Sequence, residues 1–177
     1  MSRPAVFLDR DGVLNRAPVE NGRPQTVTSA EMELEPGAAE ACASLAEAGL
    51  PLVVVTNQPD VGRGRLQRST VEQAHRRLGA LISLTAVYTC YHDDPDNCDC
   101  RKPKPGMLLR AAAEHDLDLR RSVMVGDRWR DVEAGRAAGC ATVLVDHGYD
   151  ERRADAPDLV VPSLREAVDW ILERTSS

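Results

Sequence analysis

Six short apolar runs, separated mostly by amphipathic segments, constrain the fold of this chain more than any other feature. The runs cover residues 5–8, 51–55, 85–88, 122–125, 141–145 and 159–161, and most of their side chains are aliphatic. Runs of this length and composition are typical of strands that are buried on both faces of a parallel sheet. Their alternation with helices predicts a doubly wound, Rossmann-like α/β fold.

Proline, glycine and serine residues mark where the helices between these strands begin and end. Proline is favoured at the first helical position and glycine just after the last, so we expect a first helix from Pro36 to Gly49. A serine followed three residues later by glutamate is a capping box, which predicts helix starts at Ser69 and Ser163. Pro105 should begin another helix, and Gly139 should end one.

Length, charge and hydropathy exclude several classes of function. A chain of 177 residues suits one domain, 1–177, and no apolar run approaches the ~20 residues of a membrane span. The net charge of -6 argues against nucleic acid and anionic membranes as partners, because both select basic surfaces. We therefore expect a cytoplasmic monomer that acts on a small molecule.

Polar residues lie beyond the ends of four of the predicted strands. Asp9 and Asp11 follow the first, Thr56 and its neighbours follow the second, Lys102 lies beyond the third, and Asp127 follows the fourth. In an open parallel sheet, ligands bind beyond the carboxyl ends of the strands. These side chains should therefore converge on one crevice.

The acidic residues of this set predict a magnesium site. Extended backbone would direct the carboxylates of Asp9 and Asp11 to the same side, and Asp127 adds a third from a neighbouring strand. Asp131 follows one helical turn later on the same helix face as Asp127. A cluster of oxygen ligands that must also accept a phosphate oxygen suits Mg²⁺.

The same residues fit phosphoryl transfer through a covalent intermediate. An ionised carboxylate such as Asp9 attacks phosphorus without an auxiliary base. Asp11 would then donate a proton to the leaving oxygen and later accept one from water. Lys102 and the hydroxyl of Thr56 would stabilise the charge of the transferring phosphoryl group.

A cysteine-rich segment, about residues 90–104, predicts a second metal site. Within eleven positions the chain offers the Cys3His ligand set of a closed structural zinc site, namely Cys90, His92, Cys98 and Cys100. Ordinary thiols or a disulfide are the alternatives, and Cys42 and Cys140 are expected in the core. Because Arg101 and Lys102 follow directly, zinc would order both cations against the phosphate site.

Four segments together resemble the haloacid dehalogenase superfamily of phosphatases. Residues 7–15 read Phe-Leu-Asp-Arg-Asp-Gly-Val-Leu-Asn, residues 55–58 read Val-Thr-Asn-Gln, residues 101–106 read Arg-Lys-Pro-Lys-Pro-Gly, and residues 125–127 read Val-Gly-Asp. They are similar in particular to the branch of heptose-bisphosphate and histidinol-phosphate phosphatases. This resemblance covers nearly the whole chain and implies a fold of that type, without a large cap domain and with a zinc loop.

The resemblance also implies a role for each matching residue. Asp9 matches the nucleophile and Asp11 the acid/base, while Thr56 and Lys102 match residues that hold the phosphoryl group. Magnesium would contact Asp9, the backbone carbonyl of Asp11, and Asp127. Asp131 matches a position behind the metal ligands. Candidate substrate-binding residues are Asn57, Arg101 and Arg128.

The substrate expected from this resemblance is a seven-carbon sugar bisphosphate that loses its 7-phosphate. Arg101, Arg128 and either Arg63 or Arg65 would be available for the remaining anion. Histidinol phosphate is the alternative; its amine calls for acidic or aromatic groups, and Glu20 is an isolated candidate. A zinc-organised binding module without catalysis is the alternative from another class, and retention of the catalytic residue types argues against it.

Overall fold

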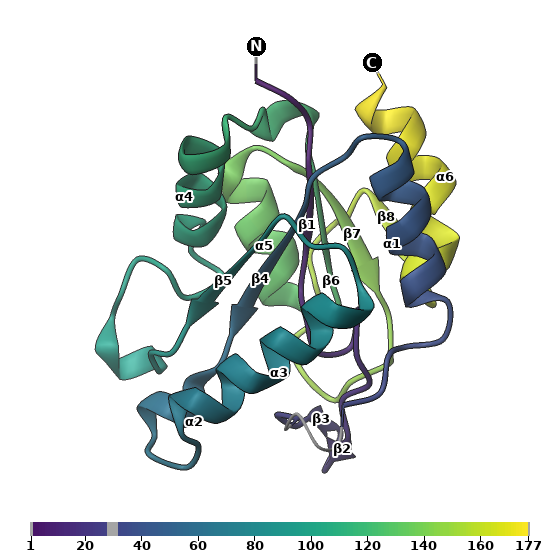
Figure 1. Ribbon diagram of the computed structural model, residues 1–177. Helices are drawn as coiled ribbons and strands as arrows, with labels where there is room; N and C mark the ends of the chain where they lie inside the picture. Colours follow the sequence, from purple (N-terminus) through teal and green to yellow (C-terminus); the bar gives the residue numbers. More distant parts are fainter. Residues whose placement is uncertain (1, 28–31, 177) are drawn as a thin grey trace.

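A six-stranded parallel sheet forms the centre of the computed structural model, which describes residues 2–27 and 32–176 (Figure 1). Every neighbouring pair of strands is parallel, as predicted. The order across the sheet is β5-β4-β1-β6-β7-β8. The strands are β1 (Val6–Leu8), β4 (Leu52–Asn57), β5 (Ala86–Cys90), β6 (Val123–Gly126), β7 (Ala141–Val145) and β8 (Leu159–Val161).

The chain reverses its direction of travel across the sheet next to β1. From β1 it proceeds outward through β4 to β5, then crosses back to β6 and proceeds to the opposite edge. Strand β1 therefore pairs with both β4 and β6, with Leu8 opposite Val54 and Val125. Such a reversal opens a crevice beyond the carboxyl ends of the two central strands, here the ends of β1 and β6.

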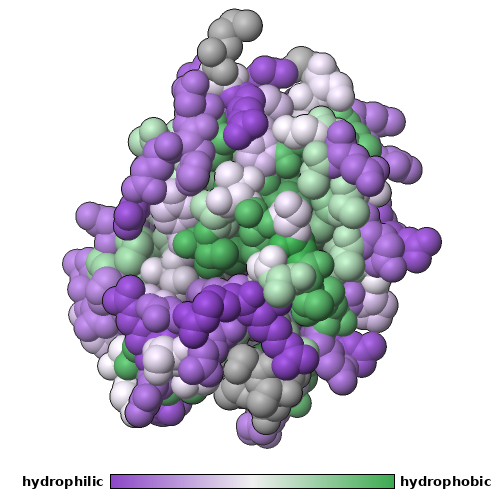
Figure 2. Space-filling model, in the orientation of Figure 1, coloured by the Kyte–Doolittle hydropathy of each residue, from purple (hydrophilic) through white to green (hydrophobic). Residues whose placement is uncertain are grey.

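Helices cover both faces of the sheet (Figure 1). Apolar residues of α1 (Ala38–Glu47), α3 (Arg68–Leu81) and α6 (Leu164–Thr175) pack in one core cluster. Residues of α4 (Gly106–His115) and α5 (Trp129–Ala138) pack in the other. Figure 2 shows hydrophilic residues along the outer side of α3, with apolar residues gathered between α3 and α1. Among the described residues, no helix has both the length and the apolar composition needed to cross a membrane.

The central strand shows why an unbroken apolar run was needed. Val6 and Leu8 belong to the cluster under α1, α3 and α6, whereas Phe7 points to the opposite cluster. All three side chains are fully buried. Because successive side chains of a strand point to opposite faces, a sheet covered on both sides requires apolar residues at every position.

Several helix starts differ from the prediction. Helix α1 begins at Ala38, because Gly37 adopts a left-handed φ of 77° that no helical residue has, so Pro36 is not the first helical residue. Helix α4 begins at Gly106, with Pro105 as its N-cap. The predicted end of α5 at Gly139 is confirmed, with a φ of 90°.

Neither predicted capping box forms as expected. Helix α3 begins at Arg68, one residue before Ser69, and has no side-chain cap. Its Glu72 instead accepts a hydrogen bond from Arg68 at 2.8 Å, since residues four apart are neighbours on a helix. Ser163 does occupy the N-cap of α6, but its hydroxyl bonds Glu166 rather than a backbone N–H.

Two long segments between the main strands and helices contain short elements. The first, 16–35, includes an antiparallel hairpin of β2 (Val19–Glu20) and β3 (Arg23–Pro24); its residues 28–31 lie outside the described residues. The second, 57–68, includes the short helix α2 (Pro59–Gly62). Two short 3-10 helices, η1 (Asp94–Asp96) and η2 (Leu119–Arg121), complete the described elements.

We expect Phe7→Ala to lower the free energy of unfolding by about 3–5 kcal/mol, because it removes a fully buried ring from the central strand. Urea denaturation of both proteins measures the difference. Leu81→Ala is the control, because Leu81 is 51% exposed and its loss should cost less than about 0.5 kcal/mol. Equal losses in the two variants would contradict this account of the core.

Candidate active site

A cavity of about 370 Å³ lies at the crevice beyond the carboxyl ends of the central strands. Its wall combines carboxylates with a larger number of cationic side chains. Every predicted site residue of the phosphate region except Thr56 lines it, and Thr56 is buried. The charged lining residues are Asp9, Asp11, Asp60, Asp94, Asp127, Asp131, Arg23, Arg63, Arg65, Arg101, Lys102, Arg128 and Arg130.

Three buried carboxylates form the floor of this site. Asp9, Asp127 and Asp131 each offer an oxygen atom, and these atoms lie within 4.8 Å of one another. Burial raises the pKa of Asp9, and the charge of Asp131 raises it further. Burial likewise raises the pKa of Asp127, with a further contribution from Asp9 and Asp131. The cluster thus requires positive charge to remain ionised.

Lys102 supplies part of that charge. Its ammonium lies 3.0 Å from Asp9 Oδ1 and 2.6 Å from Asp131 Oδ1, and it donates to the carbonyl of Val55 at 2.8 Å. Burial alone would favour the neutral amine, but the charges of Asp131 and Asp9 outweigh it and raise the pKa of Lys102. Lys102 is therefore a fixed cation in contact with the predicted nucleophile.

The carboxylate cluster also fits a divalent metal ion. One ammonium accompanies three carboxylates, so negative charge in the cluster exceeds positive charge and a further cation would offset it. Oδ1 of Asp127 is buried and has no hydrogen-bond partner in the described part of the chain. An unpartnered buried carboxylate oxygen is costly without a cation, and oxygen ligands suit a hard ion such as Mg²⁺.

Two glycines allow the carboxylates to approach the backbone closely. A Cβ at Gly126 would lie 2.1 Å from Cβ of Asp131, so only glycine leaves room for that side chain. A Cβ at Gly12 would lie 2.0 Å from Oδ2 of Asp127, and the φ of Gly12 is +83°. Both glycines thus act by excluding a side chain where two strand ends meet.

Asp11 occupies a different environment from the one expected. Its carboxylate lines the cavity but lies outside the cluster that Asp9 forms with Asp127 and with Asp131, which the sequence had placed on the same helix face as Asp127. Strand β1 ends at Leu8, so the extended geometry assumed for Asp11 does not continue. Instead, the carboxylate accepts hydrogen bonds from the buried Arg10, from Asn15 at 2.9 Å and from Gln58 at 2.9 Å. Asp9 and Asp11 therefore face the same cavity, as expected, but Asp11 does not join the three-carboxylate cluster.

The residues that follow β4 position other site residues. Asn57 donates its amide to the carbonyl oxygen of Lys102 and accepts from the Lys102 N–H, both at 3.1 Å. Gln58 donates to Thr56 Oγ1 at 3.1 Å as well as to Asp11. Sequence reasoning gave Gln58 no role, although it lies in the Val-Thr-Asn-Gln motif. The substrate-binding role of Asn57 stays a prediction, since both polar atoms of its side chain already contact Lys102.

The four predicted zinc ligands converge. Sγ of Cys90 lies 3.6 Å from Sγ of Cys98, and Sγ of Cys100 lies 3.5 Å from Cys98 and 3.4 Å from Nδ1 of His92. A tetrahedral zinc ion with Zn–S bonds of ~2.3 Å holds its sulfur ligands about 3.8 Å apart. All five cysteines are free, and Cys42 and Cys140 are buried in the core as predicted. The cluster can thus hold a metal ion.

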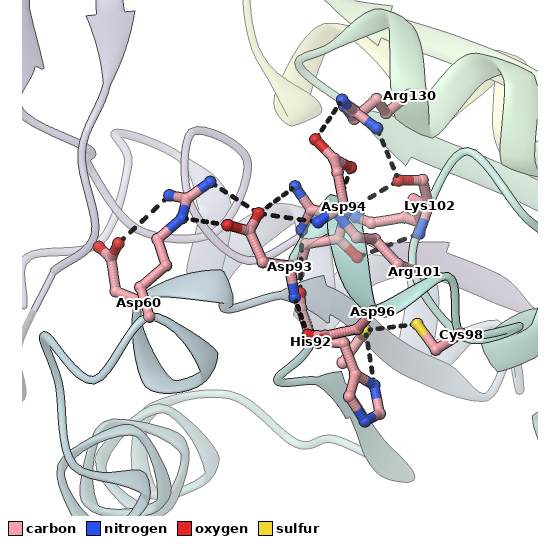
Figure 3. Close-up of polar contacts among 12 residues, drawn as sticks. Asp60, His92, Asp93, Asp94, Asp96, Cys98, Arg101, Lys102 and Arg130 are labelled. Carbon is pink, nitrogen blue, oxygen red and sulfur yellow. Dashed lines mark hydrogen bonds and ion pairs between the residues drawn. The ribbon is translucent and has the colours of Figure 1, made fainter.

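An ion-pair network joins the cysteine loop to the cavity wall (Figure 3). Arg63 donates to both carboxylate oxygens of Asp93, at 2.7 and 2.8 Å. Arg101 donates to Asp94 at 2.7 Å, and Arg130 reaches Asp94 at 3.3 Å and the carbonyl of Lys102 at 3.4 Å. Arg130 was not predicted, because only the fold brings α5 against the cysteine loop.

The loop after β7 closes the site on its other side. The hydroxyl of Tyr149 donates to Oδ2 of Asp127 at 2.8 Å, and Nε2 of His147 lies 2.7 Å from the carbonyl oxygen of Gly12. Glu151 accepts hydrogen bonds from two nitrogens of Arg128. Sequence reasoning missed Tyr149, and no motif or spacing in the sequence links it to Asp127.

Comparisons with known proteins agree with this geometry. The sequence model of the HAD-hydrolase-like family matches residues 99–167. D-glycero-D-manno-heptose-1,7-bisphosphate 7-phosphatase of Thermosynechococcus vestitus is 39% identical, over 97% of this chain and 96% of the relative. D-glycero-beta-D-manno-heptose-1,7-bisphosphate 7-phosphatase of Pseudomonas aeruginosa is 38% identical, over 89% of each chain.

A solved structure extends the likeness to the fold. The D,D-heptose 1.7-bisphosphate phosphatase of B. bronchiseptica, determined in complex with magnesium and phosphate, superposes with a TM-score of 0.79 and 30% identity. The match covers 96% of this chain and 98% of that one. Identity of this extent over nearly the full length of both chains confirms the family resemblance. The chain therefore belongs to the haloacid dehalogenase-like (HAD) hydrolases, in the family of the D-glycero-D-manno-heptose-1,7-bisphosphate 7-phosphatases.

Proposed function

We propose that residues 1–177 form a single-domain, magnesium-dependent phosphatase that removes the 7-phosphate from D-glycero-D-manno-heptose 1,7-bisphosphate. The observation that carries this proposal is the contact between the buried ammonium of Lys102 and Asp9, at 3.0 Å, beside two further carboxylates. The relatives named for this activity and the magnesium and phosphate in the solved relative support it. The enzyme would act as a cytoplasmic monomer.

In the first half-reaction, the carboxylate of Asp9 attacks phosphorus and the bond to the sugar oxygen breaks. An aspartyl-phosphate forms on Asp9, and Asp11 gives a proton to the departing oxygen. Lys102 keeps its charge within hydrogen-bond distance of Asp9 and so stabilises negative charge on the phosphoryl oxygens. Asp9, the backbone carbonyl of Asp11, and Asp127 would hold Mg²⁺, which supplies further charge stabilisation when bound.

In the second half-reaction, Asp11 accepts a proton from a water molecule, which attacks the phosphorus of the aspartyl-phosphate and releases free phosphate. The three donors around Asp11 keep its carboxylate in one place for this task. Thr56 holds a phosphoryl oxygen in this proposal, and Gln58 orients its hydroxyl at 3.1 Å. Gln58 thus links the acid/base to the phosphoryl site.

The arginines around the cavity favour a substrate with a second anion. Arg101 and Arg128, together with Arg63, Arg65 and the unpredicted Arg130, line its wall. A cationic amine such as that of histidinol phosphate would face these guanidinium groups. Glu20, the isolated candidate for binding that amine, is exposed in β2 and is not among the described residues that line the cavity. Charge therefore favours the sugar bisphosphate.

The Cys3His cluster holds a structural zinc ion in this proposal. Four protein ligands leave no open position for water, so zinc would take no part in the reaction. Lys102 follows Cys100 by two residues, and the carbonyl oxygen of Lys102 accepts from Asn57 and from Arg130. Ordering of the cysteine loop would thus hold the Lys102 ammonium against Asp9.

Asp9→Asn should reduce phosphate release by at least about 1,000-fold, because an amide is a poor nucleophile. Steady-state phosphate release and the melting temperature of the same samples test this. The fold should persist, since Asn has the same shape and the change removes one of three crowded carboxylates. Asp169→Asn, on the exposed side of α6, is the control and should keep full activity. Retention of a tenth of the activity in Asp9→Asn would rule out the mechanism.

Sugar bisphosphates should be the preferred substrates. We expect kcat/KM for the 1,7-bisphosphate, in one or both anomeric forms, to exceed that for histidinol phosphate by at least about tenfold, because the arginine wall binds a second phosphate. Simple sugar monophosphates serve as the comparison for the contribution of that second group. A tenfold preference for histidinol phosphate would reject the proposed substrate.

Cys98→Ala should lower both zinc content and turnover. Metal analysis should show loss of about one zinc per chain, and kcat should fall by about tenfold or more as Lys102 loses its support. Cys140→Ala removes a buried cysteine outside the cluster and should retain zinc and activity. Full activity in a zinc-free Cys98→Ala protein would contradict the proposed task of this loop.

A further inference from the structure

The two carboxylate oxygens of Asp127 have different surroundings. Oδ2 accepts a hydrogen bond from the Tyr149 hydroxyl at 2.8 Å. Oδ1 is buried and has no hydrogen-bond partner in the described part of the chain. The protein therefore holds one oxygen and leaves the other for a ligand that it does not supply.

Close packing holds the carboxylate of Asp127 in this orientation. A Cβ on Gly12 would lie 2.0 Å from Oδ2 of Asp127 and 3.1 Å from the hydroxyl oxygen of Tyr149. Oδ2 is thus enclosed between the backbone of Gly12 and the tyrosine hydroxyl. Rotation of the carboxylate away from this position would break the hydrogen bond that Oδ2 accepts from the partly buried Tyr149.

Tyr149 is itself fixed by the loop that carries it. On either side of it, His147 reaches the carbonyl of Gly12 at 2.7 Å, and the N–H of Asp150 donates to the carbonyl of Gly22 at 2.9 Å. The rings of His147 and Tyr149 contact each other, with centroids 5.4 Å apart. Glu151 binds Arg128, the residue next to Asp127. The loop is therefore attached to both segments that carry the proposed metal ligands.

We propose that Tyr149 is a positioning residue that restricts Asp127 to binding a cation through Oδ1 alone, and that it thereby favours Mg²⁺ over Ca²⁺. This inference rests on the magnesium site of the proposed function. Mg²⁺ demands near-ideal octahedral geometry, whereas Ca²⁺ takes six to eight oxygens in flexible geometry and readily accepts both oxygens of one carboxylate. A carboxylate restrained by a hydrogen bond to Oδ2 suits the smaller ion.

Tyr149→Phe tests this proposal, because it removes the hydroxyl and keeps the ring. Mg²⁺ and Ca²⁺ are titrated against bound Mn²⁺, followed by its electron paramagnetic resonance signal, in the zinc-loaded protein of residues 1–177 without substrate. We expect Mg²⁺ affinity to fall by about 10-fold or more, the usual effect of losing a hydrogen bond to a metal ligand. Ca²⁺ affinity should fall much less, so the ratio of the two affinities should shift toward Ca²⁺.

Two matched variants separate this effect from general damage. Tyr88→Phe removes a hydroxyl that donates to Glu114 at 2.5 Å, away from the cavity, and should leave both affinities unchanged. His147→Ala weakens the loop but keeps the Tyr149 hydroxyl, and it should keep the wild-type ratio of Mg²⁺ to Ca²⁺ affinity. Melting temperatures of all variants establish that the proteins compared are folded.

Three results would overturn the proposal. The first is an unchanged Mg²⁺ affinity in Tyr149→Phe, and the second is an equal loss of Mg²⁺ and Ca²⁺ affinity in that variant. The third is a change in the ratio of the two affinities in His147→Ala as large as that in Tyr149→Phe. Failure of the wild-type protein to bind either ion would instead defeat the magnesium site on which the proposal rests. Phosphate release by the wild-type enzyme tests the proposed function separately, because the proposed function does not depend on which oxygen of Asp127 binds the ion.

Discussion

The ion pairs of Lys102 are the interaction on which the rest of the site depends. Its ammonium is almost fully buried between Asp9 and Asp131, with Asp127 close by. Three carboxylates could not remain ionised in this environment without a cation, because burial and mutual repulsion both favour their protonated forms. The same ammonium that offsets their charge also lies beside the residue that would attack phosphorus. Stability of the folded site and readiness for phosphoryl transfer thus come from one contact.

Three segments that are far apart in the chain hold Lys102 in place. Asn57 at the end of β4 bonds both backbone polar atoms of Lys102, and Arg130 of α5 reaches its carbonyl oxygen. The cysteine loop directly before Lys102 is joined by its own ion pairs to Arg63 and Arg130 (Figure 3). Fixing a flexible lysine side chain costs about 2 kcal/mol of rotamer entropy. The backbone contacts place Lys102 beside the site, and the ion pairs with Asp9 and Asp131 offset the cost of fixing its side chain.

Close approach of backbone segments is the second constraint on the site. Gly12 lies in the loop after β1 and Gly126 is the last residue of β6, and a methyl group at either position would overlap a carboxylate side chain. The absence of two side chains therefore brings Asp127 and Asp131 within reach of Asp9. It also places Oδ2 of Asp127 beside the Tyr149 hydroxyl, so the packing that assembles the carboxylates also distinguishes the two oxygens of one of them.

The sequence by itself determined the parallel sheet, the order of polar clusters at its strand ends and the four side chains of the cysteine loop that could hold a metal ion. These features follow from short-range patterns: apolar runs at the strand period, and ligand types spaced a few residues apart. The helix starts at Ala38 and Arg68 could not be predicted, because a left-handed glycine and an Arg68–Glu72 pair override the local signals. Only the tertiary structure placed the Asp11 carboxylate outside the three-carboxylate cluster and brought Gln58, Arg130 and Tyr149 to the site. The contacts of Gln58 with Asp11, of Arg130 with Lys102 and of Tyr149 with Asp127 each join residues about 20 or more positions apart, and the position of Asp11 depends on where β1 ends. No local sequence pattern encodes either.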